Sequence, residues 1–442
     1  MKLMIGVAFL LALAGSAAAQ QEEGIFPFDY RLVELENGFK AYLIKAGAPG
    51  QIAYVSMVRT GSRDEVEEGK SGFAHFFEHM MFRGTDKYPD YDGVTSSMGA
   101  ARNGFTSSDR TVYYLVASSE YLEQIIDLES DRFMNLKYAE PDFRTEAGAV
   151  LGEQQQGAMV PGRWLNEKVR ETAYDRHTYR HTTIGYEADV RAMPEGYEYS
   201  KSFFRRFYRP ENVVLVLVGD FEFDEAEELI RQYYTPWEAG YVPPDVTPEP
   251  EQTAPRRQTV RYPGRTLPVL SINYKAPAWS ATDRLAVATQ VLGRVAFGSN
   301  SDLYKRLVIE ERKVQYLSAG FGLARDPSLV SINTMVVNPR DVRTVEQDIQ
   351  QTVERFREEL VDETLLSDTK SNMKYGFLMG LETAQNVAFA MMTSVVNTGG
   401  IEAVNDYYRT LDSITAEDVR EAARRYLMEN GKTVVTMVQA GR

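Results

Sequence analysis

The sequence of 442 residues contains no cysteine and only four histidines. The absence of cysteine excludes disulfide bonds, thiolate catalysis, iron–sulfur clusters and cysteine-ligated zinc. Basic residues are outnumbered by acidic ones, and the formal net charge of −14 argues against nucleic acid or anionic lipid as the main partner, because phosphate groups bind to basic surfaces. Any transition metal in this protein must therefore be held by histidine and carboxylate side chains.

Long apolar runs are also scarce, and the clearest one lies within residues 1–19. Lys2 is followed by an apolar run over residues 3–14 and then by Ala17-Ala18-Ala19. This order is typical of a secretory signal peptide, and we expect cleavage before Gln20. No other stretch approaches the roughly 18 apolar residues that a membrane-spanning helix requires. We therefore expect an exported protein, periplasmic or secreted, with no membrane span in the mature chain.

A proline-rich segment divides the rest of the chain. Residues 235–255 contain six prolines and little apolar periodicity, which is typical of an extended linker. We expect an N-terminal domain over residues 24–236, a linker over residues 237–256 and a C-terminal domain over residues 257–442.

The two halves share a sequence pattern near their ends. Tyr-x-x-Glu-Asn occurs at residues 208–212 and again at residues 426–430, about half of the mature chain apart. In both places a helix-like stretch precedes the pattern and a β-branched run follows it, over residues 213–218 and 433–438. The repeat indicates an internal duplication. Because helices and strands are mixed in each half, we predict an α+β fold of two homologous domains, each a mostly antiparallel sheet packed with helices.

The chemistry is concentrated in Gly-Phe-Ala-His-Phe-Phe-Glu-His at residues 72–79. On a helix, His75 and His79 share one face and can bind one metal ion, while Glu78 projects near the same edge. Two histidines and one more carboxylate would hold zinc with a position left for water, and a free glutamate would move a proton. The alternative is a pair of surface histidines, but half of the chain's histidines lie within five residues, which favours a metal centre.

The other two histidines, His177 and His181, are also four residues apart. Their surroundings are rich in threonine and arginine and run into Gly185. We expect a loop here rather than a second metal site, because no third ligand stands at helical spacing.

The order H-x-x-E-H is the inverted zincin motif. Here the sequence resembles the pitrilysin-type zinc metallopeptidases, the family of insulin-degrading enzyme and mitochondrial processing peptidase. The resemblance implies one Zn²⁺ ion per chain, with His75, His79 and Glu153 as ligands and Glu78 as the catalytic base. It places Glu146, seven residues before Glu153 and on the same helix face, where it would orient a ligand imidazole. It also implies that the second half closes over the substrate.

A substrate-binding segment is implied by the same resemblance. Asn103, Gly104 and Phe105 match the edge strand to which a substrate peptide adds as an extra β-strand in relatives. Gly104 stands where alanine is usual in the family. An ordinary structural hairpin is the alternative, and the two interpretations are compatible.

In the second half, Tyr316 matches a family tyrosine that reaches the substrate near the zinc. The family's arginine seven residues earlier is replaced by Ile309. Arg306 and Arg312 are close in sequence but would point elsewhere on a helix. Either Tyr316 alone steadies the oxyanion, or a partner chain supplies the missing arginine.

These observations predict a zinc endopeptidase that hydrolyses oligopeptides or unfolded segments, as a homodimer or as a heterodimer with a related subunit. One alternative is a zinc-bearing or peptide-binding subunit that is inactive without a partner. Another is a zinc hydrolase of non-peptide amides, which the edge-strand segment argues against, since a small substrate needs no added strand.

Overall fold

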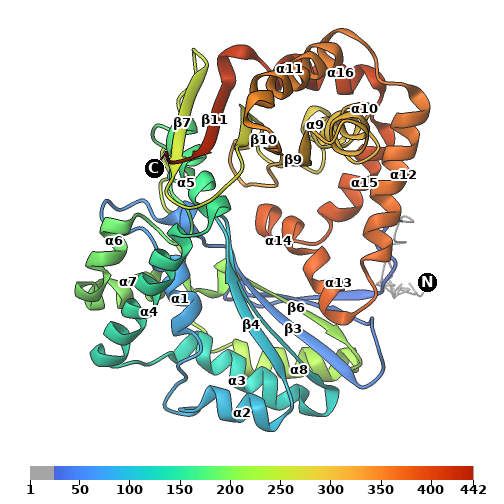
Figure 1. Cartoon of the computed structure of the whole chain (residues 1–442). Helices are drawn as coiled ribbons and strands as arrows, with labels where there is room; N and C mark the ends of the chain where they lie inside the picture. The colour runs from blue at the N-terminus through green and yellow to red at the C-terminus, as the bar shows by residue number, and fades with distance from the viewer. Residues whose placement is uncertain (1–23, 442) are drawn as a thin grey trace, which may run out of the picture.

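The computed structural model describes residues 24–441. The chain forms two halves, each built on one β-sheet (Figure 1). The predicted signal peptide lies outside the described residues.

The first half contains a six-stranded sheet. Its strands run in the order β1 (Tyr30–Glu34), β2 (Lys40–Ile44), β6 (Val213–Gly219), β3 (Gln51–Val58), β5 (Thr111–Ser118) and β4 (Ala101–Thr106). β2 and β6 are parallel, and the other neighbours are antiparallel. The β-branched run of β6 is buried along its whole length, as its unbroken apolar sequence predicts.

The second half contains a five-stranded sheet with the order β7 (Arg256–Tyr262), β11 (Lys432–Gln439), β8 (Val269–Lys275), β10 (Leu329–Val336) and β9 (Val314–Phe321). β7 and β11 are parallel, and the other pairs are antiparallel. The order and directions equal those of the first sheet without β1. The predicted fold of two homologous α+β halves is confirmed.

The helices fill the connections between equivalent strands. In the first half they are α1 (Phe73–Met80), α2 (Tyr91–Ser97), α3 (Leu122–Asn135), α4 (Glu140–Ala158), α5 (Pro161–Ala173), α6 (Glu187–Ala192), α7 (Tyr197–Phe207) and α8 (Phe223–Tyr234). In the second half they are α9 (Arg284–Phe297), α10 (Asp302–Tyr304), α11 (Val342–Glu358), α12 (Glu363–Met379), α13 (Ala384–Ala390), α14 (Met392–Thr398), α15 (Ala403–Ser413) and α16 (Ala416–Tyr426). α10 is a single short turn, because the chain continues from it as a π-helical turn over Lys305–Glu310.

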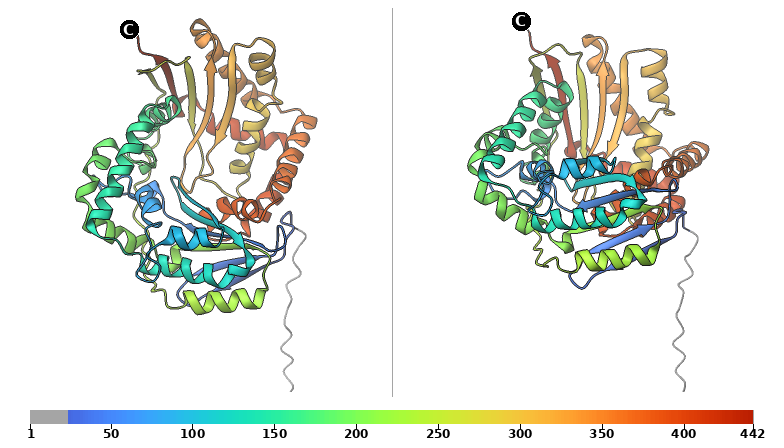
Figure 2. Two further views of the ribbon diagram at one scale, coloured as in Figure 1. Left: turned by 60° about the horizontal axis from the view of Figure 1, so that its bottom comes forward. Right: turned by 90° about the horizontal axis from the view of Figure 1, so that it is seen from below.

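The two halves exchange helices across their boundary. α5 of the first half packs on β7 and β11 of the second sheet, where Leu165 and Val169 meet Val260, Val435 and Met437. α13 of the second half packs on β3 and β6 of the first sheet, which Figures 1 and 2 show from different sides. Each sheet therefore has one face covered by its own helices and part of the other face covered by a helix of the opposite half.

The expected linker runs without helix or strand up to Arg256, the first residue of β7. It is nevertheless fastened to both halves. The Glu249 carboxylate accepts backbone N–H bonds from Asp175, Arg176 and His177 and forms an ion pair with Lys275 at 3.1 Å.

Within residues 24–441, no single helix combines the length and the apolar composition needed to cross a membrane, although the bent pair over Ala384–Thr398 and Ala403–Ser413 meets both criteria jointly.

The exchange of helices makes a prediction for stability. Met391, at the end of α13, is fully buried against the first sheet. Met391→Ala should lower the free energy of unfolding by about 2–5 kcal/mol, because it leaves a cavity between the halves. Denaturant titration measures this. Met379→Ala, at a position that is 72% exposed, is the control and should change it by less than about 0.5 kcal/mol. Equal midpoints for both variants would contradict the packing role.

Candidate metal centre

The helix α1 begins at a buried carboxylate. Gly72 precedes it with a φ of 97°, a conformation that favours glycine. The Glu65 carboxylate accepts hydrogen bonds from the backbone N–H groups of Gly72 at 2.8 Å and of Ala74 at 2.7 Å. Burial raises the pKa of Glu65 well above its usual range, while these two bonds favour the ionised form. An anion at this place satisfies N–H groups that a helix leaves free and complements the helix dipole.

The opposite end of α1 meets a buried cation. Arg132 on α3 donates a hydrogen bond to the carbonyl of Met81, the residue after the helix, at 3.1 Å. Its charge is balanced by Glu129 at 2.6 Å, and its guanidinium lies over the rings of Tyr91 and Tyr113. Both ends of the short helix are thus held by buried charges of the appropriate sign.

A loop from the first half braces the start of α1. The Ser71 hydroxyl donates to Asp189 at 2.6 Å and accepts from the backbone N–H of Tyr186. Gly72 and Gly185 both have positive φ, and a Cβ on Gly185 would lie 2.7 Å from the Ser71 carbonyl. The two backbones approach so closely that only glycine fits at either position.

His75, His79 and Glu153 come together at one point. The Nε2 atom of His75 lies 3.4 Å from Glu153 Oε2, and the Nε2 atom of His79 lies 3.6 Å from Glu153 Oε1. One ligand atom from each of the three residues lies within 4.8 Å of the others. Burial, aided by the charges of His79 and Arg163, lowers the pKa of His75 to about 4, so this imidazole is neutral and able to act as a metal ligand.

Glu146 fixes the orientation of His79. The Nδ1–H of His79 donates to Glu146 Oε1 at 2.7 Å, which leaves Nε2 to face Glu153. Arg83 binds the second Glu146 oxygen. The hydrogen bond from His79 lowers the pKa of Glu146, against the effect of burial. Burial lowers the pKa of His79, but Glu146 and Glu153 outweigh it and the net shift is upward.

Glu78 lies beside the three ligands without being one of them. Its Oε2 accepts a hydrogen bond from the Thr106 hydroxyl at 2.6 Å. Burial raises the pKa of Glu78, although the Thr106 bond opposes the shift. A Cβ on Gly104 would come within 3.1 Å of Glu78 Cγ, so the glycine at this position makes room for the glutamate.

A cavity of about 400 Å³ opens beside this cluster. Its lining includes His75, Glu78, Thr106 and Glu153 from one side and Arg163 from α5 on the other. In the described part of the chain, Arg163 has no carboxylate within ion-pair distance, and its side chain is exposed. The site therefore contains one unpaired cation next to the candidate metal position.

The predicted substrate segment forms β4, which is an edge strand because it pairs only with β5. Phe105 borders the same cavity as His75 and Glu78. Asn103 borders a second hollow on the other side of Glu78, together with Glu146 and Glu153. The edge strand thus runs past the candidate metal position, and its free edge is available to pair with an extended peptide.

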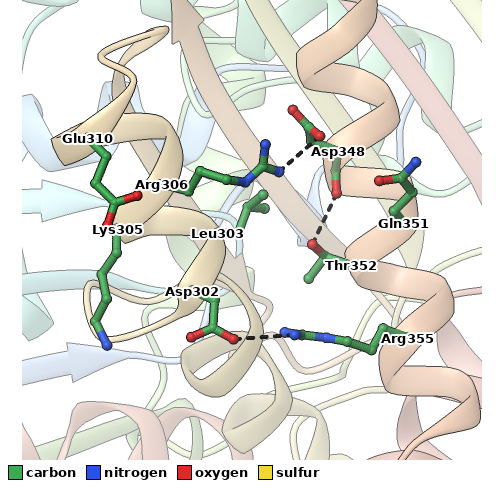
Figure 3. Close-up of a pocket in the computed structure, with 9 residues that line it drawn as sticks. All are labelled: Asp302, Leu303, Lys305, Arg306, Glu310, Asp348, Gln351, Thr352 and Arg355. Carbon is green, nitrogen blue, oxygen red and sulfur yellow. Dashed lines mark hydrogen bonds and ion pairs between the residues drawn. The ribbon is translucent and has the colours of Figure 1, made fainter.

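Tyr316 is not brought to this cluster. It lies on β9 and is 37% exposed, whereas the described residues that line the two hollows all belong to the first half. Ile309 is 58% exposed on the π-helical turn. Arg306 points away and pairs with Asp348 on α11 at 2.9 Å, as Figure 3 shows. Among the described residues, no arginine of this segment lines the metal cavity in place of the family arginine whose position Ile309 occupies.

His177 and His181 lie in a loop region with a short 3₁₀ turn, and both are buried. His177 Nδ1 accepts from the Tyr179 N–H, so its Nε2–H donates to Asp326 of the second half at 2.9 Å. Among the described residues these histidines belong to no group of metal ligands.

Sequence reasoning missed four residues that shape the centre, namely Glu65, Thr106, Arg132 and Arg163. Thr106 could have been predicted from the sequence, because it directly follows the predicted substrate segment. The other three act over distances that no local spacing reveals.

Two family models match the chain. The model described as insulinase, peptidase family M16, matches residues 43–187. The model described as peptidase M16 inactive domain matches residues 196–373. The chain belongs to peptidase family M16. This confirms the resemblance to pitrilysin-type metallopeptidases that the H-x-x-E-H motif indicates.

Named relatives of this M16 chain include a zinc protease and a peptidase subunit. It is 24% identical to the zinc protease PqqE of Helicobacter pylori, with 98% of both chains covered. It is also 24% identical to the β subunit of the mitochondrial processing peptidase of Bos taurus, with 92% of this chain and 84% of the relative covered. The family assignment supports a zinc peptidase.

Solved structures confirm the M16 fold. A protease from Helicobacter pylori superposes with a TM-score of 0.86 at 24% identity over 93% of this chain and 99% of that one. The periplasmic protease PqqL of Escherichia coli matches with a TM-score of 0.77 at 19% identity over 94% of this chain but 48% of its own length. One unit of PqqL thus corresponds to nearly the whole of this chain.

The capping of α1 by Glu65 can be tested. Glu65→Gln replaces one of the two acceptor oxygens by an amide that cannot accept, so the free energy of unfolding of the metal-free protein should fall by about 1–3 kcal/mol. Denaturant titration of chelator-treated protein measures it. Glu68→Gln, an exposed glutamate three residues further on, is the control. If the two variants were equally stable, Glu65 would not be what holds the helix.

Proposed function

We propose that the chain is an exported zinc-dependent endopeptidase. The observation that carries the proposal is the convergence of His75, His79 and Glu153 beside Glu78, on a cavity bordered by a free strand edge. A metal position, a proton carrier and a means of binding extended peptide are the three parts that peptide hydrolysis requires.

The donor set fits zinc. Two imidazole nitrogens and a carboxylate are the three protein ligands of many catalytic zinc sites, which keep a fourth position open. Glu146 orients His79 through its Nδ1–H, as expected for a ligand histidine. Zinc in such a site supplies Lewis acidity toward a carbonyl oxygen and toward water.

Glu78 is the proposed proton carrier. Thr106 fixes its carboxylate by a hydrogen bond, and burial raises its pKa toward neutrality. A carboxylate with a raised pKa both accepts a proton from attacking water and returns it to the leaving amine near neutral pH.

The substrate peptide would add to β4 beside Asn103, Gly104 and Phe105. Main-chain hydrogen bonds along a strand edge do not depend on side chains, so they favour unfolded segments of varied sequence. The strand would carry the scissile bond past Glu78.

Arg163 is the residue that we propose for stabilising negative charge on the substrate. It lines the metal cavity and has no acidic partner among residues 24–441, whereas Ile309 cannot serve and Arg306 is paired elsewhere. Charge held in such a preorganised site lowers the barrier most when it faces developing negative charge.

Export and assembly are further parts of the proposal. The residues 1–19 carry the pattern of a signal peptide, and the matching relative PqqL is named a periplasmic protease. Because PqqL is about twice the length of its match to this chain, we propose that two chains, as a homodimer or with a related subunit, enclose the substrate.

A second candidate function is that of a subunit that binds zinc or peptide but needs a partner for hydrolysis. Ile309 at the usual arginine position and the distance of Tyr316 from the metal cavity favour it. Hydrolysis of a quenched-peptide library by the purified chain alone, with zinc measured on the same sample, distinguishes the two candidates.

Mutations of Glu78 and of Glu153 should have different effects on activity and on zinc content. Glu78→Gln should lower kcat by about 10²–10⁴-fold with zinc retained, because Glu78 carries protons and is no ligand. Glu153→Ala should lose zinc after dialysis. Quenched-peptide kinetics and elemental analysis measure both effects. Gln155→Ala, exposed on the same helix, is the control. A Glu153→Ala protein with a full zinc content would overturn the ligand assignment.

Arg163→Gln should lower kcat by roughly 10²-fold without loss of zinc, because it removes one charged donor from the cavity. Ile309→Arg should leave kcat unchanged in the isolated chain if Arg163 already supplies this charge. A large gain in kcat from Ile309→Arg, with no loss from Arg163→Gln, would show that the chain lacks its cation and would favour the partner-dependent candidate.

A further inference from the structure

The shared topology of the two halves identifies the place in the second half that corresponds to the metal centre. α9 follows β8 as α1 follows β3, and α12 follows α11 as α4 follows α3. α9 also packs against α12, as α1 packs against α4. Where α1 and α4 carry the candidate metal ligands, α9 and α12 border a cavity of about 190 Å³, which we call the α9–α12 pocket.

The α9–α12 pocket has the opposite chemistry to the metal centre. Its described lining contains neither histidine nor carboxylate. Four aromatic rings form much of its wall. Trp279 stacks on Tyr407 with the ring centroids 6.4 Å apart, and Tyr408 packs against Phe377 with the ring centroids 4.8 Å apart. Such walls favour an apolar or aromatic ligand.

Arg294 is the one charged residue of the described lining. Over residues 24–441, no carboxylate lies within ion-pair distance of it. Burial raises the pKa of Tyr407 to about 12, and the charge of Arg294 opposes this shift, so the guanidinium is close enough to act on that hydroxyl.

The pocket between α10 and α11 provides a contrast. There Arg306 is paired with Asp348 and Arg355 with Asp302, as Figure 3 shows, so both arginines of its lining are already neutralised. Arg294 is exposed at the α9–α12 pocket and has no such partner among residues 24–441. A planar guanidinium with its fork of donors matches a carboxylate.

We propose that the α9–α12 pocket binds a small ligand with a carboxylate on an aromatic or branched apolar body. The cavity is smaller than the roughly 300–1,000 Å³ of pockets for drug-sized ligands, so it accepts about one side chain. The ring stack would hold the apolar body, and Arg294 would hold the carboxylate. Two sources carry this chemistry, the C-terminal residue of a peptide and a free carboxylic acid. Neither requires hydrolysis at the metal centre.

Calorimetric titration of the chelator-treated mature chain tests the proposal, because removal of metal prevents carboxylates from binding to a metal ion at the first-half centre. Three probes are compared: N-acetylphenylalanine, its amide, and 3-phenylpropionate. N-acetylphenylalanine should bind at least about tenfold more tightly than its amide, since only the acid forms a charged pair with Arg294. Preference for N-acetylphenylalanine over 3-phenylpropionate indicates a peptide C-terminus, and equal binding indicates a free acid.

Variants assign the binding to the pocket. Arg294→Gln should lower the affinity for N-acetylphenylalanine by roughly ten- to a hundredfold, and Arg294→Lys should restore part of this affinity. Arg265→Gln, in an exposed loop, carries the same charge change and should have no effect. The proposal is overturned if acid and amide bind equally, if Arg294→Gln binds as the parent does, or if no probe binds at millimolar concentration. Peptide hydrolysis plays no part in these readings, so a failure of the peptidase proposal would leave them unchanged.

Discussion

The metal centre depends on the placement of α1 between two buried charges. A helix of eight residues is too short to be stable alone, so its position must come from tertiary contacts. Glu65 satisfies its first N–H groups and Arg132 binds the carbonyl just beyond its end. Burying such groups is unfavourable unless each has partners: Glu65 accepts from backbone N–H groups, and Arg132 forms an ion pair with Glu129 besides its bond to the backbone carbonyl. Because His75, Glu78 and His79 lie on this helix, the same contacts fix their positions.

The face that α1 buries is as important as its ends. Phe73, Phe76 and Phe77 pack into the core of the first half, with Phe77 stacked on Phe203 at 5.2 Å. Aromatic contacts of this kind fix the rotation of the helix about its own axis, while the charges at its ends fix its translation. With both fixed, the two imidazoles can only face α4, where Glu146 and Glu153 lie.

The exchange of α5 and α13 ties the centre to the second half. The chain around His177 leads to the loop that braces Ser71, and His177 and Arg63 both bind Asp326 of the second half. Burial raises the pKa of Asp326, but the hydrogen bonds from His177 and Arg63 outweigh it and hold the pKa below its usual range. The stability from this contact is therefore present above the carboxyl's unfolded pKa and is lost as pH falls through the lower folded value. Acid would loosen the contact between the halves.

Much of the fold and of the site could be predicted from local pattern. The strands β6 and β11 are predictable because buried β-branched runs are distinctive, and the topology bears out the duplication that the repeated Tyr-x-x-Glu-Asn indicates. His75, Glu78 and His79 are predicted from their spacing, Glu146 and Glu153 from the resemblance, and the structure places all five close together. Glu65 and Arg132 could not be found in this way, because a lone buried charge has no period and its partner is a distant backbone group. The π-helical turn after α10 likewise reflects tertiary packing that overrides helical periodicity.

Among the described residues only the first half holds a candidate group of metal ligands, and the duplication offers a physical reason for this. A metal centre needs partly buried carboxylates and imidazoles, which cost stability unless each is hydrogen-bonded. In the first half, hydrogen bonds formed by Glu146, Arg83 and Thr106 offset this loss of stability. Once a duplicate is free of this requirement, apolar residues are the more stable choice at the same place. α9 follows that rule with a run of small buried residues, and Arg294 is its exception in the pocket. The exposed charge of Arg294, which lines an aromatic pocket and has no carboxylate partner among the described residues, is the feature that a ligand would account for.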